Sequence, residues 1–154
     1  EWRLREPSAT LLLRLSTEQI LGLLEAFPYW LAHRVPIPDS QGQVVEAEVL
    51  QPFHARWLFS LLLKLDARLV SEEISILRTL ARACVAAITL SRIRRKALRS
   101  RHKPGGEVGE AQESGEARMS RDEAGAWMVV AIVAGVWGQS DLWEDAIADM
   151  RRVT

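Results

Sequence analysis

This sequence has almost no cysteine and no net charge. Cys84 is the only cysteine among 154 residues, which excludes an intramolecular disulfide framework and is compatible with a reducing compartment. Lysine plus arginine and aspartate plus glutamate each number 20, so the formal net charge is zero and no overall attraction to nucleic acid is implied. The hydrophobic fraction of 48% is typical of a folded globular chain.

The sequence also lacks the residue patterns of an enzyme or a cofactor site. His33, His54 and His102 show no ligand spacing with Cys84 or with carboxylates, so no metal site is expected. The stretch PGGEVGE does not join a strand to a helix and is not a phosphate-binding loop. Cys84 lies on an apolar helical stripe, where a buried structural thiol is expected. The sequence therefore predicts a non-catalytic protein with no cofactor and no small-molecule substrate.

No uncharged segment has the length of a membrane span. The apolar part of the longest one, within residues 124–140, would cover roughly 20 Å as a helix, less than the ~30 Å of a bilayer core. We therefore expect a central helix there and no membrane partner. The opening residues, EWRLREPS, contain acids and lack the apolar core of a signal peptide. Because residue 1 is not Met, we expect the chain to be a fragment.

Apolar residues recur at helical spacing through most of the chain, and no pair of strands is evident. The sequence predicts an all-α fold: an irregular bundle of about five to seven helices with two largely apolar central helices, from Trp57 and from Trp127. We expect a single domain over residues 1–154, with mobile loops at about 36–51 and 101–119. A helix that is apolar on nearly all sides must be covered by other helices or by a partner, which indicates a binding groove.

Local signals predict where several helices begin or break. Ser16 and Gln19 have the spacing of a capping box, in which each side chain satisfies a backbone N–H. Pro28 should kink or divide the helix that follows. Ser120 and Glu123 have the same capping-box spacing at the start of the second apolar helix.

Residues 92–103 form a basic run with no acid in it. Its basic residues are Arg92, Arg94, Arg95, Lys96, Arg99, Arg101 and Lys103. They bind the phosphates of RNA or the acidic surface of a protein, or they form a solvated helix end that opposes the helix dipole. No aromatic side chain is interleaved for base stacking. An RNA-binding helical module using residues 92–103 stays open as an alternative function, and so does an unrelated helical adaptor.

Three segments resemble one protein family, in the family's order. Residues 56–84, RWLFSLLLKLDARLVSEEISILRTLARAC, resemble the central helix pair of the Gemin two (SMN-interacting protein) family. There an Arg-Trp-Leu opens a Leu-rich helix and the next helix ends in Leu-Ala-Arg-x-Cys. Residues 20–34 are similar to an earlier family helix, at Leu24, Glu25 and Trp30. Residues 129–144 resemble the last segment, at Trp137, Gln139, Asp141 and Leu142.

This resemblance implies a non-catalytic scaffold of the SMN complex, which assembles spliceosomal small nuclear ribonucleoproteins, with a cytoplasmic and nuclear location. In the family, a C-terminal helical domain binds a helix near the N-terminus of SMN in a groove and contacts a D-type Sm protein. The family's N-terminal arm is not recognisable here. The family's Arg that meets an acidic side chain of the SMN helix matches Arg56. Phe59, Ser60 and Leu63 lie three, four and seven residues onward on the same helical face, so the implied partner-binding residues are these four.

The residues by themselves leave two interpretations of this face. The Arg56 guanidinium either reaches solvent, with its stem over apolar neighbours, or pairs with a carboxylate. Phe59 and Leu63 belong either to the core or to an interface. We expect Trp30, Trp57 and Trp137 in the core.

Overall fold

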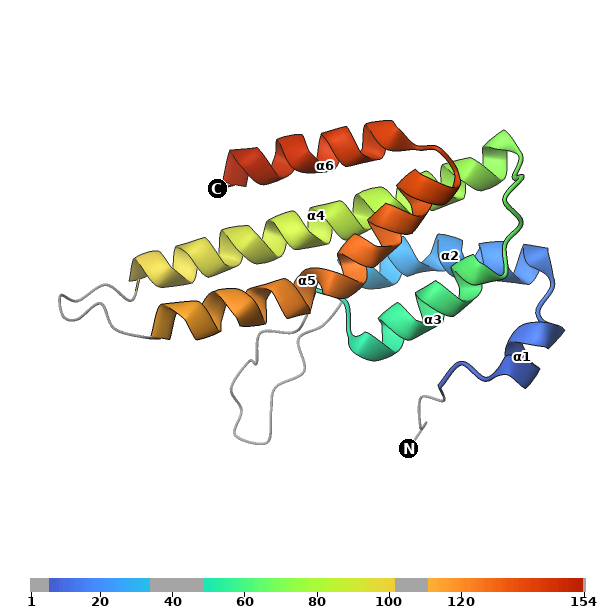
Figure 1. Cartoon of the computed structure of the whole chain (residues 1–154), viewed down its shortest axis with the longest axis horizontal. Helices are drawn as coiled ribbons and strands as arrows, with labels where there is room; N and C mark the ends of the chain where they lie inside the picture. The colour runs from blue at the N-terminus through green and yellow to red at the C-terminus, as the bar shows by residue number, and fades with distance from the viewer. Residues whose placement is uncertain (1–5, 34–48, 102–110, 154) are drawn as a thin grey trace.

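The computed structural model describes residues 6–33, 49–101 and 111–153, without the side chains of residues 98–101, 111–122 and 153. These residues form six helices: α1 (Ala9–Arg14), α2 (Thr17–Ala32), α3 (Pro52–Leu63), α4 (Ser71–Arg101), α5 (Ala111–Val136) and α6 (Ser140–Val153). No strand occurs in the described ranges. The predicted all-α, irregular helical bundle is confirmed (Figure 1).

The longest helix, α4, lies in the middle of the bundle. It packs against α2, α5 and α6, while α5 also contacts α3 and α6 (Figure 1). Buried apolar side chains from α2 through α6 form one cluster, whose fully buried members include Leu24, Leu58, Leu77, Ile88 and Val129. Each such side chain contributes about 1.5–3 kcal/mol on burial, so this cluster holds the five helices together.

Side-chain caps begin three of the helices. Ser8 Oγ accepts a hydrogen bond from the backbone N–H of Leu11 at the start of α1. At α2 the predicted capping box is confirmed: Ser16 Oγ accepts from the Gln19 N–H at 3.3 Å, and Gln19 Oε1 accepts from the Ser16 N–H at 3.0 Å. At α4, Glu73 accepts from the Val70 N–H at 2.9 Å. These caps satisfy backbone donors that a helix start leaves unpaired.

Pro28 lies inside α2 and does not divide it, so that part of the prediction is wrong. The helix continues for four residues beyond the proline, to Ala32. A proline removes one backbone donor, and here the loss falls near the end of the helix. Phe27 is buried just before it, and Leu31 packs against the core just after it. Packing on both sides of Pro28 therefore keeps the last turn in place.

The structure describes only part of each predicted loop: residues 49–51 of the first are non-helical, whereas the described part of the second is helical. Residues 36–48 of the first and 102–110 of the second lie outside the described residues. Val49 and Leu50, at the end of the first, are buried in the core. Residues 111–119, predicted as loop, begin α5, and Ser120 lies inside this helix instead of capping it. The segment AQESGEARM contains two glycine or serine breakers among good helix formers, and the helix formers prevail.

A glycine lets α3 and α5 approach closely. A Cβ placed on Gly125 of α5 would lie 2.9 Å from the Cβ of Ala55 on α3 and 3.4 Å from Leu50 Cδ2. The first distance is shorter than real Cβ contacts allow, so this crossing requires a residue without a side chain. The contact holds the N-terminal half of α3 against the core.

By length and composition alone, residues 71–97 of α4 would suffice to cross a membrane. The core helix of a water-soluble bundle passes the same test. Here α2, α5 and α6 pack against α4, and its stripe of Leu77, Leu80, Cys84 and Ile88 is buried against them. These contacts give the buried stripe of α4 a place in the core of the bundle.

Candidate partner-binding surface

The four residues implied as partner-binding lie together on one side of α3. Arg56, Phe59 and Leu63 are exposed, and Ser60 is partly buried between them. Phe59 is 41% and Leu63 is 68% exposed, whereas Leu58, Leu61 and Leu62 on the other side of the helix are buried. Two large apolar side chains at the surface, one turn apart, are not part of the core. The structure thus gives α3 a core face and an exposed apolar face.

Arg56 meets a carboxylate of its own chain. Its Nε donates to Glu6 Oε2 at 2.8 Å, and its Nη2 donates to Glu6 Oε1. The hydrogen bonds from Arg56 lower the pKa of Glu6, so the carboxylate is ionised at neutral pH. Ser60 Oγ donates to the Arg56 carbonyl oxygen at 2.8 Å, which turns its hydroxyl toward the helix backbone. Glu6 was not expected from the sequence, because 50 residues separate it from Arg56 and no local pattern joins them.

The expected core position is right for one tryptophan and wrong for another. Trp137 is buried and Trp57 partly buried, but Trp30 is 51% exposed at the end of α2. Its ring packs edge-on against Phe27 with centroids 5.2 Å apart. Tyr29 beside it is also exposed. The end of α2 therefore exposes Tyr29 and Trp30, in addition to Phe59 and Leu63 of α3.

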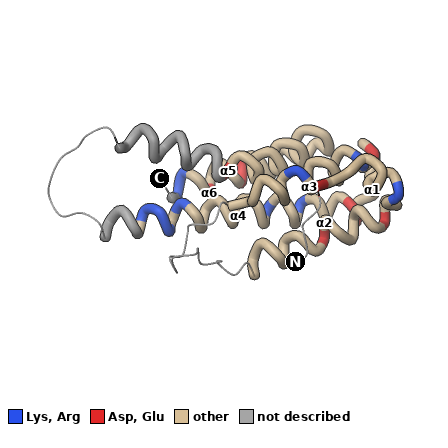
Figure 2. The backbone as a smooth tube through the Cα atoms, turned by 90° about the horizontal axis from the view of Figure 1, so that it is seen from below, with Lys and Arg blue, Asp and Glu red and all other residues tan. Residues whose placement is uncertain are grey.

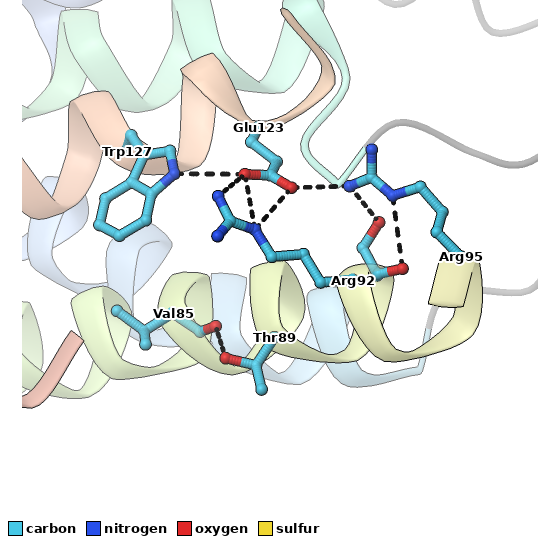
Figure 3. A network of polar contacts seen from close by, with 7 residues as sticks. Val85, Thr89, Arg92, Arg95, Glu123 and Trp127 are labelled. Atoms are coloured by element: carbon cyan, nitrogen blue, oxygen red, sulfur yellow. Dashed lines mark hydrogen bonds and ion pairs between the residues drawn. The ribbon is translucent and has the colours of Figure 1, made fainter. Parts of the chain in front are cut away.

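Two arginines of the basic run at residues 92–103 form ion pairs with a buried carboxylate. Glu123 of α5 is buried, and its carboxylate accepts from Arg92 Nη2 at 2.6 Å and from Arg95 Nη2 at 2.7 Å (Figure 3). The Trp127 indole N–H points at the same carboxylate, with Nε1 3.4 Å from Oε2. The hydrogen bonds from Arg92 to Glu123 raise the pKa of the Arg92 guanidinium. Two of the seven cations thus hold α4 against α5, which weakens the RNA-binding alternative.

Basic positions remain towards the C-terminal end of α4, where Figure 2 shows them gathered. Arg94 is exposed there. The side chains of Arg99, Arg101 and Lys103 lie outside the described residues. The part of the run that the structure describes is therefore a solvated helix end joined to α5 through Arg92 and Arg95.

Residues that carry the family resemblance meet where α5 turns into α6. The Trp137 indole donates to the Asp66 carbonyl at 3.1 Å. Arg78 of α4 donates to the side chain of Gln139 and, at 3.0 Å, to Asp141 Oδ1. Gly138, with a positive φ of 66°, makes the turn between the helices. These residues connect α4, α5 and α6 and serve the architecture of the bundle.

Packing accounts for Cys84, His33 and His54, whereas His102 lies outside the described residues. Cys84 is buried on α4, and burial raises the pKa of its thiol to about 12, so it is not a thiolate at neutral pH. His33 stacks on Tyr29 at 4.0 Å, and His54 lies edge-on to Phe27. In the part of the chain that the structure describes, no three His, Cys, Asp or Glu side chains converge as metal ligands.

Comparison with known proteins supports one family. Residues 2–140 match the family model of survival motor neuron (SMN) interacting protein 1, a stretch that covers α1 to α5. No curated protein and no solved structure matches. The family match agrees with the resemblance in the helical segments, and the alternative of an unrelated helical adaptor is wrong. The chain belongs to the SMN-interacting protein 1 family.

Proposed function

We propose that this chain is a non-catalytic scaffold subunit of an SMN complex, acting in spliceosomal snRNP assembly in the cytoplasm and nucleus. It binds the N-terminal helix of SMN on the exposed face of α3 and contacts D-type Sm proteins elsewhere on its surface. Membership of a family of SMN-interacting proteins supports the choice of partner. The SMN helix, the α3 face and the SMN complex are the proposed parts of this function.

The observation that carries this proposal is the composition of the α3 face. Arg56, Phe59 and Leu63 follow one another at helical spacing and are all exposed. An amphipathic partner helix buries apolar anchors at such spacing, and an arginine fork binds a carboxylate through two parallel hydrogen bonds. Covering Phe59 and Leu63 would remove apolar surface from water, while the ion pair would fix the register of the partner.

The first test is calorimetric titration of the chain with the N-terminal helix of SMN from the same species. We expect Arg56→Glu to weaken binding by about 2 kcal/mol or more, roughly thirtyfold, because a partner carboxylate would face a carboxylate instead of a guanidinium. Circular dichroism checks that the variant stays helical. Arg94→Glu makes the same charge change at an exposed position of α4 and should bind like the wild type.

Salt concentration separates this function from RNA binding. An apolar face with one ion pair should lose little affinity between about 50 and 200 mM salt, whereas binding through several phosphates should fall steeply. Arg94→Glu would weaken RNA binding and leave the SMN helix unaffected. No measurable binding of the SMN helix by the folded wild-type chain would overturn the proposal.

A further inference from the structure

The pair formed by Arg56 and Glu6 has the geometry expected of a partner's acidic side chain. Both carboxylate oxygens of Glu6 accept from the guanidinium, through Nε at 2.8 Å and through Nη2. This two-bond fork is the arrangement by which arginine recognises a carboxylate. A second carboxylate cannot make the same two bonds while Glu6 holds these nitrogens.

The ion pair between Arg56 and Glu6 is exposed and therefore weak. The side chain of Arg56 is 54% exposed and that of Glu6 is 60% exposed, so water screens their attraction. The helix that follows Glu6, α1, has no buried residue, and its Leu11 and Leu13 are exposed. Its contacts with the other described helices are sparse. Leu12 packs α1 against the core, so the helix itself can stay in place, whereas releasing the exposed Glu6 side chain from Arg56 would cost little.

The rest of the face does not depend on this segment. Phe59 and Leu63 are exposed although Glu6 is paired with Arg56, so the two apolar side chains are accessible while the guanidinium is occupied. A partner helix with an acidic side chain would find two of its three contacts ready. It would have to displace a carboxylate to complete the third.

We propose that Glu6 is an intramolecular competitor at the partner-binding face, and that an incoming acidic helix takes Arg56 by displacing it. This inference rests on the proposed function and adds its regulation. Only molecules in which Arg56 is unpaired can make the charged contact, so the apparent affinity is the intrinsic affinity multiplied by the unpaired fraction.

The experiment compares Glu6→Gln with the wild-type chain in titrations with the SMN N-terminal helix. An exposed pair of this kind predicts a gain in affinity of about two- to fivefold when the competing charge is removed. Glu144→Gln is the matched control: it removes one exposed negative charge on α6 and should leave the affinity unchanged. In an Arg56→Glu background, Glu6→Gln should no longer tighten binding through this contact.

A second readout follows Arg56 directly. The Nε–H resonance of Arg56 should move in Glu6→Gln relative to the wild type before any helix is added. It should move again when the helix binds.

The outcomes separate the two proposals. Wild type and Glu6→Gln that bind equally tightly, with Arg56→Glu impaired, would overturn the competition and keep the proposed function. Binding by Glu6→Gln that exceeds the wild type only as much as Glu144→Gln does would also overturn it, because general charge would explain the gain. No binding by any variant, Glu6→Gln included, would overturn the proposed function and the competition with it.

Discussion

The buried Glu123 gives two arginines of the basic run, Arg92 and Arg95, a structural role. The carboxylate is buried, the Arg95 side chain is 12% exposed and the Arg92 side chain 37% exposed. Such a buried group gains little over an apolar replacement of the same shape, but it is costly to break, since the remaining charges stay without a counterion. Glu123 is therefore a structural requirement for placing α5 on α4.

Removing the charge of Glu123 should destabilise the fold. For Glu123→Gln we expect a loss of about 3 kcal/mol in the free energy of unfolding, because two guanidinium groups would face each other with one neutral acceptor between them. Urea denaturation followed by circular dichroism measures it. Asp149→Asn is the control: Asp149 pairs with Arg152 at 3.4 Å on the exposed surface of α6, and its loss should cost under about 0.5 kcal/mol. Equal costs for the two substitutions would contradict the role given to Glu123.

At the scale of elements, the helices are held by different devices. The caps at Ser16 and Glu73 define where α2 and α4 begin. The crossing of α3 and α5 depends instead on the missing side chain of Gly125. Gly22 of α2 differs, because it has open space where a Cβ would lie. A side chain fits at Gly22 but not at Gly125.

This contrast predicts opposite signs for one substitution. Gly125→Ala should destabilise the protein by about 1–3 kcal/mol, because its Cβ would overlap Ala55 and push α3 away from α5. Gly22→Ala should stabilise it by about 0.5–1 kcal/mol, because alanine loses less backbone entropy in a helix. Thermal or urea unfolding of the two variants measures both values. Stabilisation by both would mean that the crossing tolerates a wider separation than the structure shows.

At the scale of the whole molecule, one ion pair fastens the C-terminal helix to the centre of the bundle. Arg78 of α4 holds Asp141 at the start of α6, and the hydrogen bonds from Arg78 lower the pKa of Asp141 below its ordinary 3.8. A carboxyl whose pKa is lower in the folded than in the unfolded chain stabilises the fold above its unfolded pKa. That stabilisation is lost as the pH falls through the folded value.

The stabilisation of the fold by Asp141 should therefore disappear in acid. Wild type should be more stable than Asp141→Asn at neutral pH, and the difference in unfolding free energy should shrink as the pH falls below 3.8. Urea unfolding at a series of pH values measures the difference. In an Arg78→Met background the difference should be small at every pH. A difference that is independent of pH in the wild-type background would mean that Asp141 acts through the helix start alone.

The sequence by itself determined the helical class and the start of α2. Caps, helical spacing and apolar stripes depend on residues three or four positions apart, so the chain encodes them locally. Predictions from local sequence were wrong at two places, residues 111–119 and Pro28. Residues 111–119 are helical despite Ser114 and Gly115, and Pro28 is tolerated because Phe27 and Leu31 anchor the turn around it. The four implied partner-binding residues came from resemblance and spacing, and their binding role stays a prediction.

Only the tertiary structure decided which charges meet and which tryptophan faces water. Glu6 reaches Arg56 across 50 positions, Glu123 reaches Arg92 across 31, and Arg78 reaches Asp141 across 63. No local pattern records such pairs. They form because the packing of apolar helix faces brings their backbones together, and only that packing sets which polar side chains lie within hydrogen-bonding distance.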